Sequence, residues 1–292
     1  MYSFHGDKKH HSYFEGWYLK QQNDVGAVAI IPAFHVRDDG KQSASLQIIT
    51  KEGSYNLKYH IKKFKASKNR FRVQIGDNIF SEYGCKLSCK DKDFYMRGAL
   101  RYSPFRKPDY DIMGPFKYVP FMECRHSILS LTHAVNGSIR INDKVYTFSN
   151  HIGYVEGDRG TSFPKRYIWT QCNWRENCIV VSIADIPFCG GSFVGCIGSI
   201  LLNGKEYRIA TYLGVKLLHL SEDMIYLSQG NLTLLVELLE SNSKPLYAPR
   251  NGNMERTIHE SIACKVRYTC IFKDKVIFRF ISDQASYESC WL

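Results

Sequence analysis

Short segments in which apolar and polar residues alternate recur along most of this chain, and turn-forming residues separate them. In residues 80–89, every second side chain is apolar or small. Asp38-Asp39-Gly40 and Lys51-Glu52-Gly53 have the composition of tight turns between such segments. A period of two residues is typical of half-buried β-strands, so the pattern predicts antiparallel sheets and little helix.

The same pattern can be followed to the end of the chain. It predicts strands over residues 13–22, 25–36, 43–50, 54–65, 70–76, 80–89, 94–102, 121–133, 138–141, 145–149, 178–186, 193–202, 205–213, 215–220, 224–228, 231–240, 262–272 and 275–282. Asn136-Gly137 and Asn203-Gly204 are typical of two-residue hairpin turns. Residues 253–261 are the one segment that we expect to be a short helix.

The number of strands exceeds what one small sheet can hold. At 292 residues, with 44% hydrophobic and 14% aromatic residues, the chain can bury a large core. We therefore predict an all-β protein of two tandem lipocalin-like antiparallel β-barrels or sandwiches with little helix. The expected domains are residues 1–149 and residues 150–292.

The segment from Gly153 to Trp174 carries the densest set of candidate functional residues. Its first part combines glycines with the carboxylates Glu156 and Asp158 and ends at Pro164, which predicts an acidic loop. From residue 167 the side chains alternate again, which predicts a strand. One face of that strand carries Tyr167, Trp169, Gln171 and Asn173.

This segment resembles the signature of the tocopherol cyclase-like proteins, with a glycine-acid loop, a Phe-Pro pair and an aromatic strand in the same order. Three further matches are Tyr13-Phe14-Glu15-Gly16-Trp17-Tyr18, Glu123 followed by the segment Gly137 to Phe148, and Pro245-Leu246-Tyr247-Ala248-Pro249. The resemblance covers most of the chain. It implies the two-barrel architecture of the related carotenoid hydratase and pericyclase families, with a pocket at or between the barrels.

The resemblance also implies a reaction and a set of residues. The reaction protonates the prenyl double bond of a prenylated quinol, or of a similar apolar substrate, and closes a ring without a cofactor or a metal. The candidate catalytic residues are Glu15, Glu123, Glu156, Asp158 and His126. The candidate substrate-binding residues are Trp17, Tyr154, Arg159, Phe163, Trp169, Gln171 and Asn173.

These side chains have the chemistry that such a reaction needs. A carboxyl group buried among apolar groups keeps its proton toward neutral pH, and aromatic faces attract a cation. Arg159 stands where the family usually has Trp. Its guanidinium would repel a developing cation unless it pairs with Glu156.

Three functions therefore stay open. The first is an intramolecular lyase or isomerase of the tocopherol cyclase type. The second is a non-catalytic protein that binds a lipid, a quinone or another hydrophobic ligand without converting it. A third, an adaptor for a membrane surface or a nucleic acid, depends on the charge of the chain.

That charge is strongly positive, at +11, and part of it is concentrated in one segment. Residues 58–72 hold seven basic residues and no acidic residue. A lysine-rich strand edge, an anionic membrane surface and a nucleic acid each fit this segment, the nucleic acid least well.

The chain offers no apolar run of the kind that a signal peptide needs. We therefore expect a cytoplasmic protein, with attachment to a membrane periphery left open. We also expect the ten cysteines to be free thiols.

Overall fold

The computed structural model describes residues 4–120, 122–188 and 190–291. The chain divides into two compact units, and each is described by itself. The first unit comprises Met1–Asp111, Glu123–Phe163 and Leu246–Thr257. The second comprises Ile112–Met122, Pro164–Pro245 and Ile258–Leu292. The predicted division between residues 149 and 150 lies inside a strand, and it stays a prediction.

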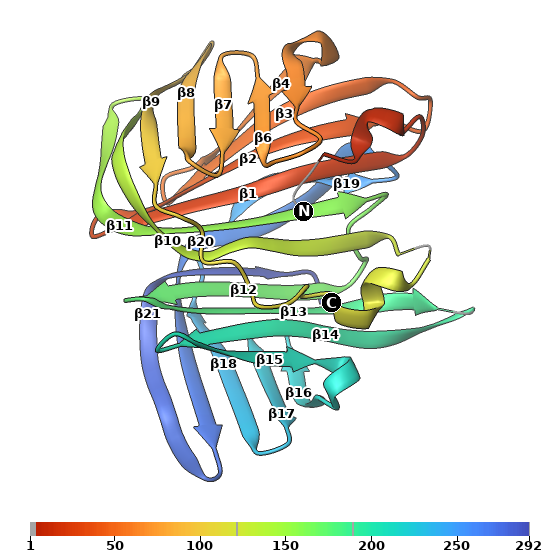
Figure 1. The fold of residues 1–292 in the computed structure, drawn as a ribbon, viewed down its shortest axis with the longest axis vertical. Coiled ribbons are helices and arrows are strands. Elements are labelled where there is room, and N and C mark those ends of the chain that lie inside the picture. The colour runs from red at the N-terminus through yellow and green to blue at the C-terminus, as the bar shows by residue number, and fades with distance from the viewer. Residues whose placement is uncertain (1–3, 121, 189, 292) are drawn as a thin grey trace. The chain divides into compact units, whose positions relative to one another are not determined.

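The first sheet has eleven antiparallel strands (Figure 1). Their bounds are β1 (Tyr13–Asn23), β2 (Gly26–Val36), β3 (Gln42–Thr50), β4 (Ser54–His60), β5 (Phe64–Ala66), β6 (Arg72–Ile75), β7 (Asn78–Ser81), β8 (Gly84–Asp91), β9 (Phe94–Tyr102), β10 (Cys124–Ile141) and β11 (Lys144–Gly160). Their order is β4-β3-β2-β1-β11-β10-β9-β8-β7-β6-β5, so β1 pairs with β11 although nine strands lie between them in sequence.

The second sheet has ten antiparallel strands. Their bounds are β12 (Tyr167–Trp174), β13 (Asn177–Phe188), β14 (Gly191–Leu202), β15 (Lys205–Ala210), β16 (Lys216–Ser221), β17 (Met224–Gln229), β18 (Leu232–Glu240), β19 (Lys244–Arg250), β20 (Asn253–Phe272) and β21 (Lys275–Ser289). The order is β15-β14-β13-β12-β21-β20-β18-β17-β16, and β19 pairs with β20. The predicted fold class, two large antiparallel β units with little helix, is confirmed.

Helix is limited to short 3-10 turns among the described residues. These are η1 (Gly6–Lys8), η2 (Ile61–Lys63), η3 (Gly114–Tyr118) and η4 (Thr211–Leu213). The helix predicted over residues 253–261 is wrong, because this segment belongs to β20, where Glu260 and Ser261 already pair with β21. In the described part of the chain, no helix has the length and apolar character needed to cross a membrane.

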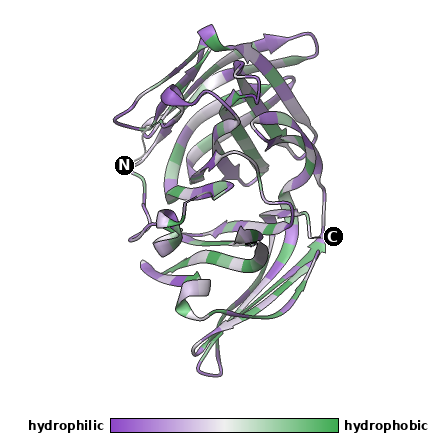
Figure 2. Cartoon of the chain, turned by 90° about the vertical axis from the view of Figure 1, so that its right-hand side faces the viewer, coloured by the Kyte–Doolittle hydropathy of each residue, from purple (hydrophilic) through white to green (hydrophobic). Residues whose placement is uncertain are grey.

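Each sheet places its hydrophobic core on one face, and Figure 2 shows the resulting bands of hydrophobic and hydrophilic residues along the strands. In the first unit, Trp17, Leu19 and Val155 point into the core with the apolar residues of β2, β3 and β6 to β10. Their neighbours on the other face of the sheet, Tyr18 and Glu156, are also buried. A strand with a period of two residues therefore separates an apolar face from a polar one.

The second unit repeats this arrangement with different residues. Its core includes Ile168, Cys172 and Tyr268. The nine described cysteines are free thiols, as predicted, and six of them are buried. The tenth, Cys189, lies outside the described residues, as does residue 121 of the predicted strand over residues 121–133.

One glycine-containing segment was predicted as a loop and another as a hairpin turn, and strands include most of the first and all of the second. The acidic loop predicted from Gly153 is wrong up to Gly160, because these residues complete β11. A Cβ atom at Gly153 would lie 2.3 Å from His133 Nε2, so this glycine makes room for a neighbouring side chain. The hairpin turn predicted at Asn136-Gly137 is also wrong, since β10 continues through it with a register shift between Val135 and Gly137.

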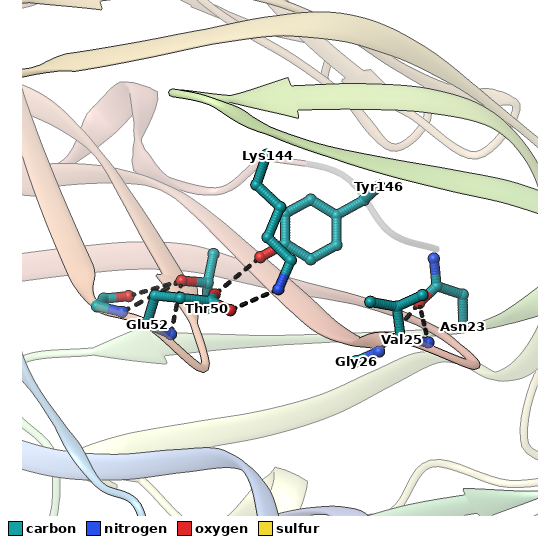
Figure 3. A network of polar contacts seen from close by, with 8 residues as sticks. Asn23, Val25, Gly26, Thr50, Glu52, Lys144 and Tyr146 are labelled. Carbon is teal, nitrogen blue, oxygen red and sulfur yellow. Dashed lines mark hydrogen bonds and ion pairs between the residues drawn. The ribbon is translucent and has the colours of Figure 1, made fainter.

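The predicted turn after β3 is tied to β11 by side chains (Figure 3). Thr50 Oγ1 accepts hydrogen bonds from the backbone amides of Glu52 and Gly53, both at 3.2 Å. Glu52 in turn accepts hydrogen bonds from Lys144 Nζ at 2.5 Å and from Tyr146 Oη at 2.9 Å. Strands distant in sequence are thus joined at this end of the first sheet.

Candidate functional site

Strands β10 and β11 bring three titratable side chains together on one face of the first sheet. In the register of this pair, His126 lies opposite Asp158 and Ile128 lies opposite Glu156. Directly paired residues project to the same face of a sheet, as do residues two apart on one strand. His126, Glu156 and Asp158 therefore share the face that is opposite the hydrophobic core.

The imidazole ring of His126 has a carboxylate on each side. Its Nδ1 lies 2.9 Å from Asp158 Oδ1, a hydrogen-bond distance. Its Nε2 lies 3.4 Å from Glu156 Oε2, an ion-pair distance without the alignment of a hydrogen bond. A ring with carboxylates beside both nitrogens is best matched by the doubly protonated imidazolium, which carries a hydrogen on each.

Two further side chains hold the carboxylates in place. The Tyr154 hydroxyl donates a hydrogen bond to Glu156 Oε2 at 2.5 Å. The Cys124 thiol donates a weak hydrogen bond to Asp158 Oδ1 at 3.6 Å. Burial and the charge of Asp158 together raise the pKa of this thiol well above its usual range, which keeps it protonated.

The electrostatics of the cluster favour a charged His126. Burial lowers the pKa of this imidazole, but the charges of Asp158 and Glu156 outweigh that effect, with a smaller contribution from Asp111. The resulting pKa is about 9, above the usual 6.5. His126 therefore carries its proton at neutral pH in a site with little contact with water, which is the state required of an acid.

Among the described residues, this cluster is also the one group of three whose ligand atoms, all within 4.8 Å of one another, could hold a metal ion. A metal would require His126 to lose its proton, since only the neutral imidazole is a ligand. The two carboxylates favour the charged imidazolium instead. The donor set thus fits an ion, while its electrostatics favour a proton.

The candidate acids Glu15 and Glu123 have different surroundings. Glu15 lies on the face of the first sheet that is opposite to His126, Glu156 and Asp158. It accepts hydrogen bonds from the His5 amide and the Tyr13 hydroxyl, both at 2.9 Å. Glu123 precedes β10, and its backbone oxygen accepts a hydrogen bond from the Thr161 amide at 2.8 Å. These contacts anchor the N-terminal segment and the start of β10.

Arg159 lies on the opposite face of β11 from Glu156 and Asp158, because it directly follows Asp158 and successive side chains of a strand point to opposite faces. In the register with β1 it lies opposite Glu15. The expected choice between repelling a cation and pairing with Glu156 therefore does not arise on the face that carries His126.

Two of the candidate aromatic residues of the first unit pack against other rings. Trp17 belongs to the core, with its ring centroid 6.0 Å from that of Phe71. Phe163 makes an edge contact with Phe14 at 5.4 Å. Tyr154 is the aromatic residue of the predicted set that contacts the cluster directly, through Glu156.

Trp169, Gln171 and Asn173 belong to the second unit, on the face of β12 that is opposite its core. All three are buried. Gln171 Nε2 donates a hydrogen bond to Asn173 Oδ1 at 2.6 Å. This side-chain pair fixes the orientation of both amides.

The same face of the second unit carries two buried acids that the sequence analysis missed. Glu260 and Glu288 are opposite each other in the register of β20 and β21, and Glu288 is also opposite Trp169. The Tyr167 hydroxyl donates a hydrogen bond to Glu288. Glu260 was missed because it lies in the segment predicted as a helix. Glu288 was missed because the strand predicted over residues 275–282 ended before it. An alternation followed to the end of β21 would have placed Glu288 on this face.

Comparisons with known proteins agree with this description of the fold and of the central strands. Residues 93–186 match the model of the family described as Tocopherol cyclase-like. A search of curated protein sequences finds no match.

Solved structures share the fold over nearly the whole chain. A candidate AttH protein from Nitrosomonas europaea has a TM-score of 0.59 at 10% identity, over 100% of this chain and 95% of that chain. Kievitone hydratase from Nectria haematococca has a TM-score of 0.52 at 10% identity, over 99% of this chain and 94% of that chain. The predicted resemblance is thus confirmed: the segment that carries His126, Glu156 and Asp158 matches the tocopherol cyclase-like family.

Proposed function

We propose that the chain is an isomerase that uses His126, Glu156 and Asp158 to protonate the double bond of a prenylated quinol or a similar apolar substrate, after which a ring closes. The observation that carries the proposal is the position of His126 between two carboxylates, which keeps its imidazole charged at neutral pH. Such a ring can donate a proton, and the negative charges beside it are already fixed in position.

The proposed step is balanced without a redox partner. The His126 imidazolium gives one proton to the less substituted carbon of the double bond, and positive charge develops on the other carbon. The phenol oxygen of the same substrate then bonds to that carbon and releases its proton, which returns to the imidazole. The atoms of the substrate are rearranged, and no electrons leave it.

The carboxylates supply what the transition state requires. When His126 loses its proton, Glu156 and Asp158 remain as an uncompensated negative charge beside the developing cation. Charges fixed in a site that excludes water stabilise a transition state more strongly than the same charges in water. The Tyr154 hydroxyl, 2.5 Å from Glu156, holds one of these carboxylates in position.

The comparisons support this class of chemistry in coarse terms. One family model names a cyclase, and one protein of the same fold is named a hydratase. Both reactions can begin with protonation of a carbon-carbon double bond, and they differ in whether an oxygen of the substrate or of water captures the cation. The prenylated quinol is the substrate that we propose from the sequence resemblance.

The decisive experiment compares turnover of a supplied prenyl quinol by the native chain and by Glu156→Gln and His126→Gln variants. We expect turnover to fall by roughly 100-fold to 10,000-fold in each variant, the usual contribution of a general acid. Glu52→Gln is the matched control, because it makes the same chemical change in the same unit at a half-exposed position outside the cluster. Turnover should also be unchanged by prior treatment with EDTA.

Other outcomes would redirect the proposal. Full turnover in Glu156→Gln would remove the cluster from the mechanism. Loss of turnover in Glu15→Gln, with the fold intact, would move the site to the other face of β1. Co-purification of an apolar molecule that the native chain never alters would leave binding without catalysis as the function.

A further inference from the structure

Four cationic side chains lie close together on the outer face of β8, β9 and β10. Arg97 lies directly opposite Arg140 in the register of β9 and β10. Lys86 lies opposite Ala99, so that Arg97 and Arg101 are its two diagonal neighbours. All four cationic residues are exposed. Directly opposed residues on paired strands are about 5 Å apart at Cβ, and diagonal neighbours are about 7–8 Å apart.

Like charges directly opposite each other destabilise a sheet, so neighbouring acids normally balance them. Here they do not. The four cationic residues make no ion pair with any described acid. At the outward positions of β6 to β9 and of residues 136–141 in β10, the alternation places no Asp or Glu. The outward residues there are Arg72, Gln74, Ile79, Ser81, Gly84, Lys86, Ser88, Lys90, Tyr95, Arg97, Ala99, Arg101, Asn136, Ser138 and Arg140.

The positive face extends toward one end of the sheet. Arg72 of β6 is opposite Ser81, and the exposed Arg70 lies in the turn that precedes β6. Lys68 of the same turn adds no net charge, because it pairs with Asp7 at 2.5 Å. Tyr83, in the turn between β7 and β8, is 68% exposed. Tyrosine is enriched where proteins meet the interface of a bilayer, because its ring is apolar and its hydroxyl is polar.

The other end of the face is bounded by acids. Asp91 and Asp93 lie at the turn between β8 and β9, and Asp143 lies at the turn between β10 and β11. These two turns line one hollow together with Arg140. Both ends of the face therefore have mixed charge, since Glu82 lies beside Tyr83, and the part without acids is formed by the outward positions of the strands between the turns.

We propose that this outer face of β8, β9 and β10 docks on an anionic membrane surface. An array of exposed cations without acidic partners matches a layer of phospholipid headgroups, which attracts each nearby cation. A single-stranded nucleic acid fits less well, since its binding uses a row of aromatic side chains on which bases stack. Tyr95 is the one aromatic residue among the outward positions named above.

This inference rests on the proposed function only for its purpose, which is to bring the chain to a substrate that is dissolved in the membrane. A prenylated quinol is apolar and partitions into bilayers, so an enzyme held at the surface meets its substrate there. The docking of the face itself depends on charge alone and can be tested without any turnover.

The experiment uses co-sedimentation of the full chain with vesicles of phosphatidylcholine, with or without phosphatidylserine. We expect binding to the phosphatidylserine vesicles that is lost as salt is added. The combined Lys86→Gln, Arg97→Gln and Arg101→Gln variant should bind on the order of 100-fold more weakly, from about fivefold for each cation.

The control is a Lys216→Gln, Lys275→Gln and Arg279→Gln variant, which removes the same charge from exposed positions in the second unit. It should bind like the native chain. Equal losses in both variants, or no loss in the first, would overturn the assignment of this face. Displacement from the vesicles by polyuridylate at equal phosphate concentration would assign the face to nucleic acid instead.

A turnover arm separates this inference from the proposed function. The variant of the outer face should convert a detergent-dispersed prenyl quinol at the native rate and a vesicle-embedded one more slowly. Slower turnover in detergent as well would show that the substitutions damage the site rather than docking. If the native chain converts neither substrate, the proposed function fails while vesicle binding still decides the role of the face.

Discussion

His126 and His133 lie on the same strand, and both rings are largely withdrawn from water, yet their protonation is opposite. His126 lies between Glu156 and Asp158, and its pKa is raised to about 9 although burial lowers it. His133 points into the core, where burial lowers its pKa to about 3. The difference shows that burial alone makes a histidine neutral, and that carboxylates on the same face reverse the effect.

The alternation of β11 produces this contrast. His126 is opposite Asp158 on one face of the sheet. His133 is opposite Gly153, and this pair lies on the core face. Gly153 has no side chain, and the His133 ring occupies the space above it. One strand thus offers charge on one face and an empty position on the other.

The largest expected effect is on the pKa of His126 when the two carboxylates beside it are removed, which leaves it buried without them, as His133 is. In a Glu156→Gln and Asp158→Asn double variant, burial is opposed only by the smaller effect of the Asp111 charge, so the pKa of His126 should fall from about 9 to below 6.5. Each pKa unit corresponds to about 1.4 kcal/mol, so the change amounts to more than about 3 kcal/mol. Titration of the histidine C2 protons by NMR measures it, with His133 as the internal reference.

Linkage gives the same experiment a second readout. A group whose pKa is raised on folding stabilises the fold below its unfolded pKa, and this stabilisation is lost as pH rises through the folded value. The native chain should therefore lose stability between about pH 6.5 and pH 9, and the double variant should not. A pKa that stays near 9 in the variant would show that other groups hold the charge.

The residues of the cluster were predictable from sequence, but their arrangement was not. The resemblance singled out Glu156, while Asp158 was a candidate within the same motif and His126 a candidate near Glu123. The two glycines around the acids nevertheless indicated a loop. In the structure these glycines are positions of close approach, since a Cβ at Gly157 would lie 3.1 Å from Trp17. A single sequence does not show whether a glycine permits a turn or makes room for a distant ring, because that depends on the partner strand.

The strands themselves were predicted more reliably, since alternation within a strand is local information. The register of β1 with β11 was not predictable, because it joins residues about 140 positions apart. It is this register that places Glu15 and Arg159 on the face opposite Glu156. The candidate set therefore mixed residues from two faces.

An effect of intermediate size is expected at acid pH. A base whose pKa is lowered on folding binds more protons in the unfolded chain, so stability is lost as pH falls from about 6.5 toward 3. His133 and His35 both have a pKa lowered to about 3 by burial. Each should lower the free energy of unfolding by about 2 kcal/mol between pH 7 and pH 5.

A His133→Gln variant should remove about half of this acid dependence, with the His35 contribution as the built-in comparison. Urea unfolding at the two pH values measures it. An unchanged slope would mean that the His133 ring is hydrated, and that burial does not set its protonation as the comparison with His126 requires.

The smallest effect is expected at an ion pair that shares the charges of the His126 cluster but not its burial. Glu52 accepts hydrogen bonds from Lys144 and Tyr146, which outweigh a raising effect of burial and lower its pKa to about 2 (Figure 3). Its side chain is 50% exposed and that of Lys144 is 38% exposed, so solvent screens the pair. A Glu52→Gln variant should therefore lose less than about 1 kcal/mol at pH 7, despite the large displacement of the pKa.

The sign follows from the direction of that displacement. An acid with a lowered pKa stabilises the fold above its unfolded value of 4.5 and loses this contribution as pH falls toward 2. Thermal unfolding of Glu52→Gln and Lys144→Gln at pH 7 should give equally small losses, because each variant removes the same screened interaction. Charge and hydrogen bonding are common to Glu52 and His126, and exclusion of water is the difference between them. If Glu52→Gln lowered the free energy of unfolding by as much as the pKa change of His126 represents, exclusion of water would not explain that difference.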